Sequence, residues 1–269
     1  MTFTLVALAV LYSRGWYRIS KTLPNLIPVW RLAAFAGGLI ALWVAVSSPL
    51  AELDEQLLTA HMAQHLLLMT MAAPLILLGA PSITLLHALP RRFVRDMLGP
   101  LIRWRPFHRL GRICTRPAFC WLAASGVVIG WHVPAAFDLA LRSHHWHEIE
   151  HASFFAAGLF FWWPVIRPWP SVAESQRWSI PLYLFLATLP CDALSAFLAF
   201  CDHVVYRPYL SAEGAFHLSP LQDQALAGAL MWVTVTFAYL IPALVVTVQI
   251  LSGARVTTFP EANSRRSGS

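Results

Sequence analysis

The chain alternates between long apolar runs and short polar or basic stretches. Since about 20 apolar residues cross the hydrocarbon core of a bilayer, seven of these runs are predicted to be membrane-spanning helices. The first run is short for a span, about 17 Å if helical. We expect one all-α membrane domain over residues 1–251, followed by a polar tail, 252–269. The predicted spans lie near residues 2–12, 28–46, 57–80, 117–137, 148–166, 179–201 and 224–251.

Composition supports an integral membrane protein and excludes a sizeable soluble domain. Of the 269 residues, 58% are hydrophobic and 12% are charged, and the mean hydropathy is +0.59. A soluble domain would carry about 25% charged residues. The sequence contains no Walker loop, no GxSxG and no glycine-rich dinucleotide loop, so we expect no enzymatic activity of the hydrolase or nucleotide-dependent classes.

Basic residues are concentrated in alternate connections. The connection Pro81–Arg116 holds eight arginines and one acid, Asp96, whereas the connections on the other side hold only Arg142 and Arg207 among several acids. The positive-inside rule therefore predicts that the basic side is cytoplasmic, with the N-terminus outside and the C-terminus inside. We expect the arginine-rich connection to contact anionic membrane lipids rather than nucleic acid.

Two histidines interrupt the uncharged run Leu57–Ala80. His61 and His65 are four residues apart, so both imidazoles lie on one helix face. Intramembrane ionisable residues are expensive in lipid and usually mark a functional site. Three further histidines, His132, His147 and His151, are predicted at a similar depth on two other spans, because each lies within roughly 12 Å of the same membrane face.

Five histidines at one depth predict a metal or cofactor site. Imidazole is a common ligand for copper and zinc, and the pairs His61/His65 and His147/His151 each have the HxxxH spacing. Thioethers suit Cu(I) in particular, and carboxylates can orient imidazole rings. Residues expected around the ligands are Met62, Glu148, Glu150, Asp192 and Met231.

A packing role is the alternative for each histidine taken singly, since polar side chains also hydrogen-bond between membrane helices. The remaining histidines are assigned no ligand role. We expect His144 and His145 to be solvated, and His87 and His108 to lie near lipid headgroups, while His203 and His217 stay unassigned.

Four segments together resemble one known family. They are HMAQHLLLMTMAAPLILLGAP (61–81), WHVPAAFDLAL (131–141), HEIEHASFFAAGLFFWWPV (147–165) and LQDQALAGALMW (221–232). The set is similar to the CtaG family, the multispanning assembly factors of caa3-type cytochrome c oxidases. The matching positions are His61, Met62, His65, Pro74, Trp131, His132, Pro134, His147, His151, Asp223, Gln224, Gly228, Met231 and Trp232.

The resemblance implies a non-enzymatic role in maturing a haem-copper oxidase in the bacterial inner membrane. It implies that the histidines hold copper and deliver it to an oxidase subunit, and it adds Asp223 to the residues expected near the metal. Two other functions stay open. A copper transporter would need a polar path to the cytoplasm, but Thr70 is the only polar residue below His65 in its span. A haem-binding redox protein would need a clean pair of facing histidines.

Overall fold

The structure is a computed structural model that describes residues 2–23, 27–100, 104–168, 178–210 and 218–252. The described residues form helices and connecting turns, with no strand among them. Within these ranges, five helices are long and apolar enough to cross a membrane, or up to six if one bent pair is counted as a span. The predicted all-helical membrane fold is confirmed, whereas the predicted count of seven spans is not. Most of the predicted polar tail lies outside the described residues.

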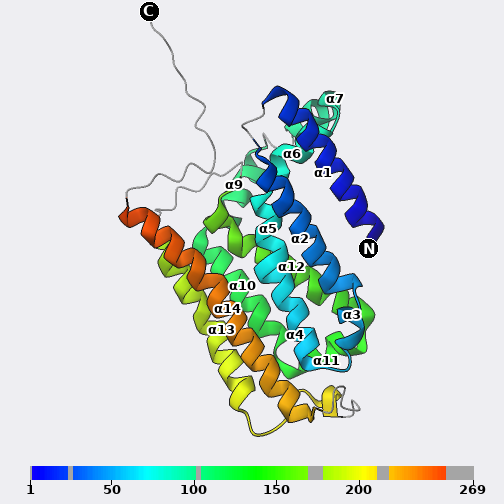
Figure 1. Cartoon of the computed structure of the whole chain (residues 1–269), viewed down its shortest axis with the longest axis vertical. Coiled ribbons are helices and arrows are strands. Elements are labelled where there is room, and N and C mark those ends of the chain that lie inside the picture. The colour runs from blue at the N-terminus through cyan, green and yellow to red at the C-terminus, as the bar shows by residue number, and fades with distance from the viewer. Residues whose placement is uncertain (1, 24–26, 101–103, 169–177, 211–217, 253–269) are drawn as a thin grey trace, which may run out of the picture.

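The five candidate spans lie side by side in one bundle (Figure 1). One of them contains a π-helical segment, η1, between two α-helical segments. The spans are α2 (Val29–Ser47) continued by α3 (Leu50–Leu53), α4 (Leu58–Leu66) with η1 (Leu67–Ala72) and α5 (Ala73–Leu78), α12 (His144–Ile166), α13 (Ser179–Phe200) and α14 (Pro220–Leu251). The other helices are α1 (Thr2–Thr22), α6 (Pro81–Ala88), α7 (Arg91–Phe93), η2 (Val94–Leu98), α9 (Arg105–Cys114), α10 (Pro117–Trp131), α11 (Pro134–Arg142) and η3 (Arg207–Leu210).

The first helix is longer than predicted. Helix α1 has 21 residues and continues past the predicted end at Tyr12 to Thr22, so that boundary is wrong. The Tyr12 hydroxyl donates to the carbonyl of Gly79 at 2.6 Å, and Arg18 donates to the carbonyls of His87 and Ala88 at 3.2 Å. These contacts hold the polar half of α1 against the neighbouring segments, and α1 is not among the candidate spans.

The fourth predicted span is broken. Residues 117–137 were expected as one helix, but α10 ends at Trp131, α11 begins at Pro134, and their axes differ by 74°. Proline lacks a backbone N–H and disfavours helical geometry in the residue before it; accordingly Val133 is extended, with φ −66° and ψ 126°. The break places His132 at the end of α10.

Close contact of α12 with η1 and α5 holds α12 against the span that carries His61 and His65. A Cβ added at Gly158 would lie 2.9 Å from Ala73 Cβ and 3.0 Å from Met69 Cα, so only glycine allows this approach. The indole Nε1 of Trp162 donates to the carbonyl of Met69 at 2.8 Å. This bond satisfies a backbone group in η1, where the regular α-helical pattern is interrupted.

The two ends of the bundle differ in chemistry. α3, α11 and η3 lie at one end, which we call the site end, and α6, α7 and α9 lie at the other, the basic end (Figure 1). At the basic end, an open groove of about 840 Å³ is lined by Arg18, Lys21, His87 and Arg95 among others. The lipid contact expected for this region stays a prediction.

Reporter fusions test the predicted orientation. A fusion after Arg142 should report the outer face and one after Arg112 the cytoplasm, because the positive-inside rule places the arginine-rich connection inside. Alkaline phosphatase and green fluorescent protein fusions at each position provide the opposing readouts. The reversed pattern would place the site end in the cytoplasm and contradict the predicted orientation.

Candidate metal centre

The centre begins with two buried imidazoles on α4. His61 is 0% exposed and His65 is 4% exposed, and their ring centroids are 4.4 Å apart. The ring of His65 stacks on Phe154 at 3.9 Å. The spacing of four residues therefore places both rings on the inward face of α4, as the sequence predicts.

Asp223 on α14 positions the helix that carries these two rings. Its carboxylate accepts from the backbone N–H of Leu58 at 2.6 Å and of Thr59 at 3.1 Å, and from the Thr59 hydroxyl at 2.6 Å. Free N–H groups at a helix start need acceptors, and a carboxylate also suits the helix dipole. Asp223 was expected beside the metal ligands; it binds the backbone at the start of α4 instead.

A second pair of imidazoles faces the first from α12. His147 and His151 have ring centroids 4.3 Å apart. The ring of His61 lies 5.5 Å from that of His147 and nearly parallel to it, and the ring of His65 lies 5.6 Å from that of His151. The structure therefore brings together four of the five histidines that the sequence singled out.

Glu150 lies inside this cluster. It is 0% exposed, and its Oε1 is 3.5 Å from Nε2 of both His61 and His65. It was expected to orient a ligand from outside. Its position between two imidazoles makes it a candidate ligand itself, because one carboxylate oxygen approaches both rings.

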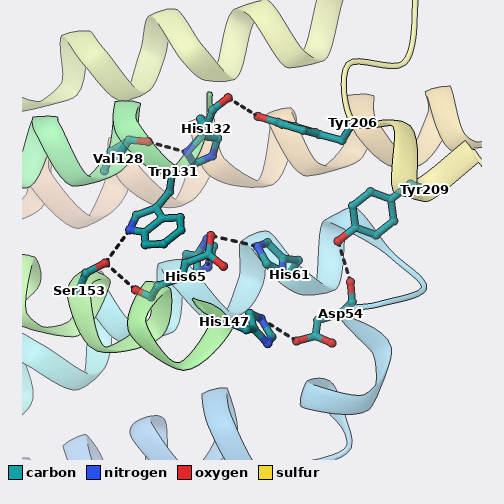
Figure 2. Close-up of polar contacts among 11 residues, drawn as sticks. Asp54, His61, His65, Val128, Trp131, His132, His147, Ser153, Tyr206 and Tyr209 are labelled. Atoms are coloured by element: carbon teal, nitrogen blue, oxygen red, sulfur yellow. Dashed lines mark hydrogen bonds and ion pairs between the residues drawn. The ribbon is translucent and has the colours of Figure 1, made fainter. Parts of the chain in front are cut away.

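Asp54 is a member of the cluster that sequence reasoning missed. It is 1% exposed, and its Oδ2 lies 3.3 Å from His147 Nε2, while its backbone carbonyl accepts from the Tyr209 hydroxyl at 2.7 Å (Figure 2). Burial raises the pKa of the Asp54 carboxyl, and His147 and His61 oppose the rise. An acid in a polar loop gave no signal that it would fold inward.

His132 lies on another side of His65. Its Nδ1 is 2.7 Å from the carbonyl of Val128 in the preceding turn (Figure 2). Since a carbonyl can only accept, Nδ1 carries the hydrogen and Nε2 is left as the free lone pair. Both His132 and His65 line a small cavity, together with Met62 and Met231. His132, Met62 and Met231 thus lie near the other histidines, as expected, but they line the cavity beside His65.

Many polar atoms of the cluster have no hydrogen-bond partner. Buried polar groups are usually paired, and leaving one unpaired is costly. Among the described residues, the buried side-chain atoms without such a partner include both ring nitrogens of His61 and of His65, Nε2 of His132, His147 and His151, both carboxylate oxygens of Glu150, and Oδ2 of Asp54. Their number and convergence make the cluster a candidate site for an ion.

Two overlapping ligand sets have metal-site spacing. Asp54, His147 and His151 form one set and His61, His147 and Glu150 the other, with one ligand atom of each residue within 4.8 Å of the others. Atoms that share an ion at about 2.0–2.2 Å lie within this range. Nitrogen and carboxylate oxygen donors are suited to copper or zinc.

Two residues expected near the ligands belong to neither ligand set. Glu148 is 65% exposed and faces His144 at 3.4 Å; His144 and His145 are exposed, as expected. Asp192 is half-buried on α13 and belongs to neither ligand set. Glu148 and Glu150 are two residues apart, so their side chains point in directions that differ by roughly 200° around the helix axis, and only Glu150 faces the interior.

Aromatic side chains cover the cluster at the site end. Phe137 lies 5.0 Å from His61, centroid to centroid, and stacks on Tyr206 at 3.9 Å. The Tyr206 hydroxyl donates to the carbonyl of His132 at 3.2 Å. Phe137, Tyr206 and Tyr209 are at most 3% exposed, so they form a buried aromatic layer beside His61 and His132, whereas the His147 side chain is still 20% exposed.

Curated relatives match most of this chain. A protein of Mycobacterium leprae described as uncharacterized is 26% identical over 239 residues, covering 85% of this chain and 35% of the relative. Uncharacterized proteins of Mycobacterium bovis and Mycobacterium tuberculosis are each 27% identical over 237 residues, covering 84% of this chain and 35% of the relative. The chain thus spans about a third of the length of these relatives. No solved structure matches it significantly.

A family model matches nearly the whole chain. Residues 10–252 match the model described as cytochrome c oxidase caa3 assembly factor, Caa3_CtaG. The match includes all five predicted histidine ligands, together with Asp54 and Glu150. The chain therefore belongs to the Caa3_CtaG family of cytochrome c oxidase caa3 assembly factors.

Proposed function

We propose that this protein holds copper and delivers it to a cytochrome c oxidase during assembly. The copper would be held in the histidine–carboxylate cluster, formed by Asp54, His61, His65, His147, Glu150 and His151. One observation carries the proposal: buried imidazoles and carboxylates of three chain segments converge without hydrogen-bond partners. The family supplies the oxidase as client. We infer a non-catalytic role at the bacterial inner membrane, with oxidase subunits and membrane lipids as partners.

The convergence of these buried imidazoles and carboxylates favours a metal-binding role for the histidines over a role in helix packing alone. A histidine that only joins helices would use its ring nitrogens in hydrogen bonds, whereas Nδ1 of His61 and of His65 has no partner and Nε2 of each has only Glu150 Oε1, at 3.5 Å. An ion coordinated by several of these atoms would replace the missing bonds and offset the cost of burying them. Copper is preferred to zinc because the client of the family is a haem-copper oxidase.

The geometry favours a small ion over a haem. Five of the six pairs among the four imidazole rings have centroids 6.4 Å or less apart, and the adjoining cavity measures about 30 Å³. That volume admits a water molecule or an ion but not a porphyrin. An absorbance spectrum of the purified protein distinguishes the two, because a bound haem would give a Soret band.

Oxidase activity in cells tests the proposal. His65→Ala removes an imidazole from a buried cluster, so we expect cytochrome c oxidase activity to fall at least about tenfold, as losses around metal sites typically do. The level of this protein should stay normal, and added copper should restore part of the activity. The measurements are oxidase turnover in isolated membranes and immunoblots of this protein.

His144→Ala is the matched control, since it removes an exposed imidazole from the same end of the bundle. It should leave oxidase activity unchanged. Full activity in His65→Ala cells with normal protein levels would show that the cluster serves packing. A fall in cellular copper that precedes any oxidase defect would instead favour a copper transporter.

A further inference from the structure

A small cavity lies beside the histidine–carboxylate cluster, inside the bundle. It has a volume of about 30 Å³, which exceeds the space that one water molecule needs. Segments far apart in the sequence line it, including α4, η1, α12, α13 and α14. The side chains with nitrogen or sulfur atoms on its wall are His65, His132, Met62, Met69, Met231 and Cys191.

The sulfur-containing side chains are held in the core. Met62 is 1% exposed, Met231 is 4% exposed and Met69 is 6% exposed. The rest of the wall is apolar apart from Thr70 and Tyr239, and the Thr70 hydroxyl is already bonded to the carbonyl of Leu66 at 2.7 Å. The methionine sulfurs at this cavity are therefore soft, uncharged donors.

One imidazole at the cavity is prepared to bind an ion. His132 is 7% exposed, its Nδ1 is bonded to the Val128 carbonyl at 2.7 Å, and its Nε2 has no hydrogen-bond partner. An imidazole whose other nitrogen is fixed by a carbonyl has a set tautomer and orientation, as metal-binding histidines commonly do. A cavity serving only packing would leave this buried lone pair unpaired, at a cost.

We propose that this cavity is a second metal site, which binds monovalent copper through His132 Nε2 and the thioethers of Met62 and Met231. Thioether and imidazole are ligands that Cu(I) accepts, whereas Mg²⁺ and Ca²⁺ require oxygen. The cluster with Asp54 and Glu150 offers nitrogen and charged oxygen instead. The inference rests on the proposed copper function, and it assigns the two ligand chemistries to two neighbouring sites.

His65 lies between the two sites. Its ring contacts His61 and His151 of the cluster, and it also lines the cavity. Both of its nitrogens lack hydrogen-bond partners. We infer that His65 is shared, so that an ion can pass from one site to the other without leaving the protein.

X-ray absorption at the copper edge tests the site. The purified protein, loaded with one equivalent of Cu(I) under reducing conditions, should show sulfur as well as nitrogen scattering. Met62→Leu and Met231→Leu nearly preserve side-chain volume but remove one thioether each. Each should reduce the sulfur scattering and weaken Cu(I) binding at least about tenfold in chelator competition.

Met71→Leu is the matched control, because Met71 is 51% exposed on the same span and should leave Cu(I) binding unchanged. His147→Ala, which alters only the cluster, should keep the sulfur signal. Absence of sulfur scattering in the wild type, or unchanged affinity in both core methionine variants, would overturn the inference. The proposed function would survive that result if His65→Ala cells still lost oxidase activity.

Discussion

The double variant His61→Ala/His65→Ala should fold but bind copper more than about 100-fold more weakly than the wild type. It removes two of the four clustered imidazoles, and losses of 10- to 100-fold are typical even for residues that only support metal ligands. The fold should persist because α4 keeps the Asp223 contacts at its start. Elemental analysis of the purified proteins after copper loading measures the difference.

The double variant His144→Ala/His145→Ala is the control. It also removes two imidazoles, but their side chains are 82% and 90% exposed. Its copper content should equal that of the wild type. Equal copper in the cluster variant and the wild type would mean that the cluster does not hold the metal.

Gly228→Leu should strongly destabilise the fold. A Cβ at Gly228 would lie 2.7 Å from the backbone nitrogen of Ala199 and 2.7 Å from the carbonyl oxygen of Ser195. Both atoms belong to the backbone of α13, so α13 and α14 must move apart to admit any side chain. Overpacking typically costs about 1–3 kcal/mol, and we expect about 3 kcal/mol or more because backbone is displaced. The loss is measured by thermal unfolding in detergent and by protein level in membranes.

Gly126→Leu on α10 is the control, since a Cβ at that position would meet no atom within 4 Å other than the backbone of its own helix. It should leave the unfolding temperature unchanged or slightly raised, because leucine favours a helix more than glycine does. Similar unfolding temperatures for the two leucine variants would show that the close approach of α13 and α14 does not limit stability.

Much of this architecture could be predicted from the pattern of apolar residues. A membrane helix needs about 20 such residues to satisfy its backbone within lipid, so the spans near 28–46, 57–80, 148–166, 179–201 and 224–251 correspond to helices with small shifts at their ends. The first helix was less predictable, because tertiary contacts of Tyr12 and Arg18 let it continue through basic residues.

Pro134 was a sequence signal for the break after α10. A proline within an apolar run does not always end a helix, and Pro164, Pro190 and Pro242 lie inside continuous helices. Local sequence therefore could not decide between a kink and a 74° break. Packing of α11 against α12 and η3 at the site end favours the break.

Sequence alone determined the membrane class, the apolar helices and the two HxxxH pairs, because these depend on composition and on residues within one or two turns. The tertiary structure decided which side chains meet across helices. Asp54 and Glu150 joined the imidazoles, Asp223 capped α4 from 165 residues away, and Glu148 stayed outside. Such contacts depend on how closely helices approach, as at Gly158 and Gly228, and this distance is set by the packing of the whole bundle rather than by any single segment.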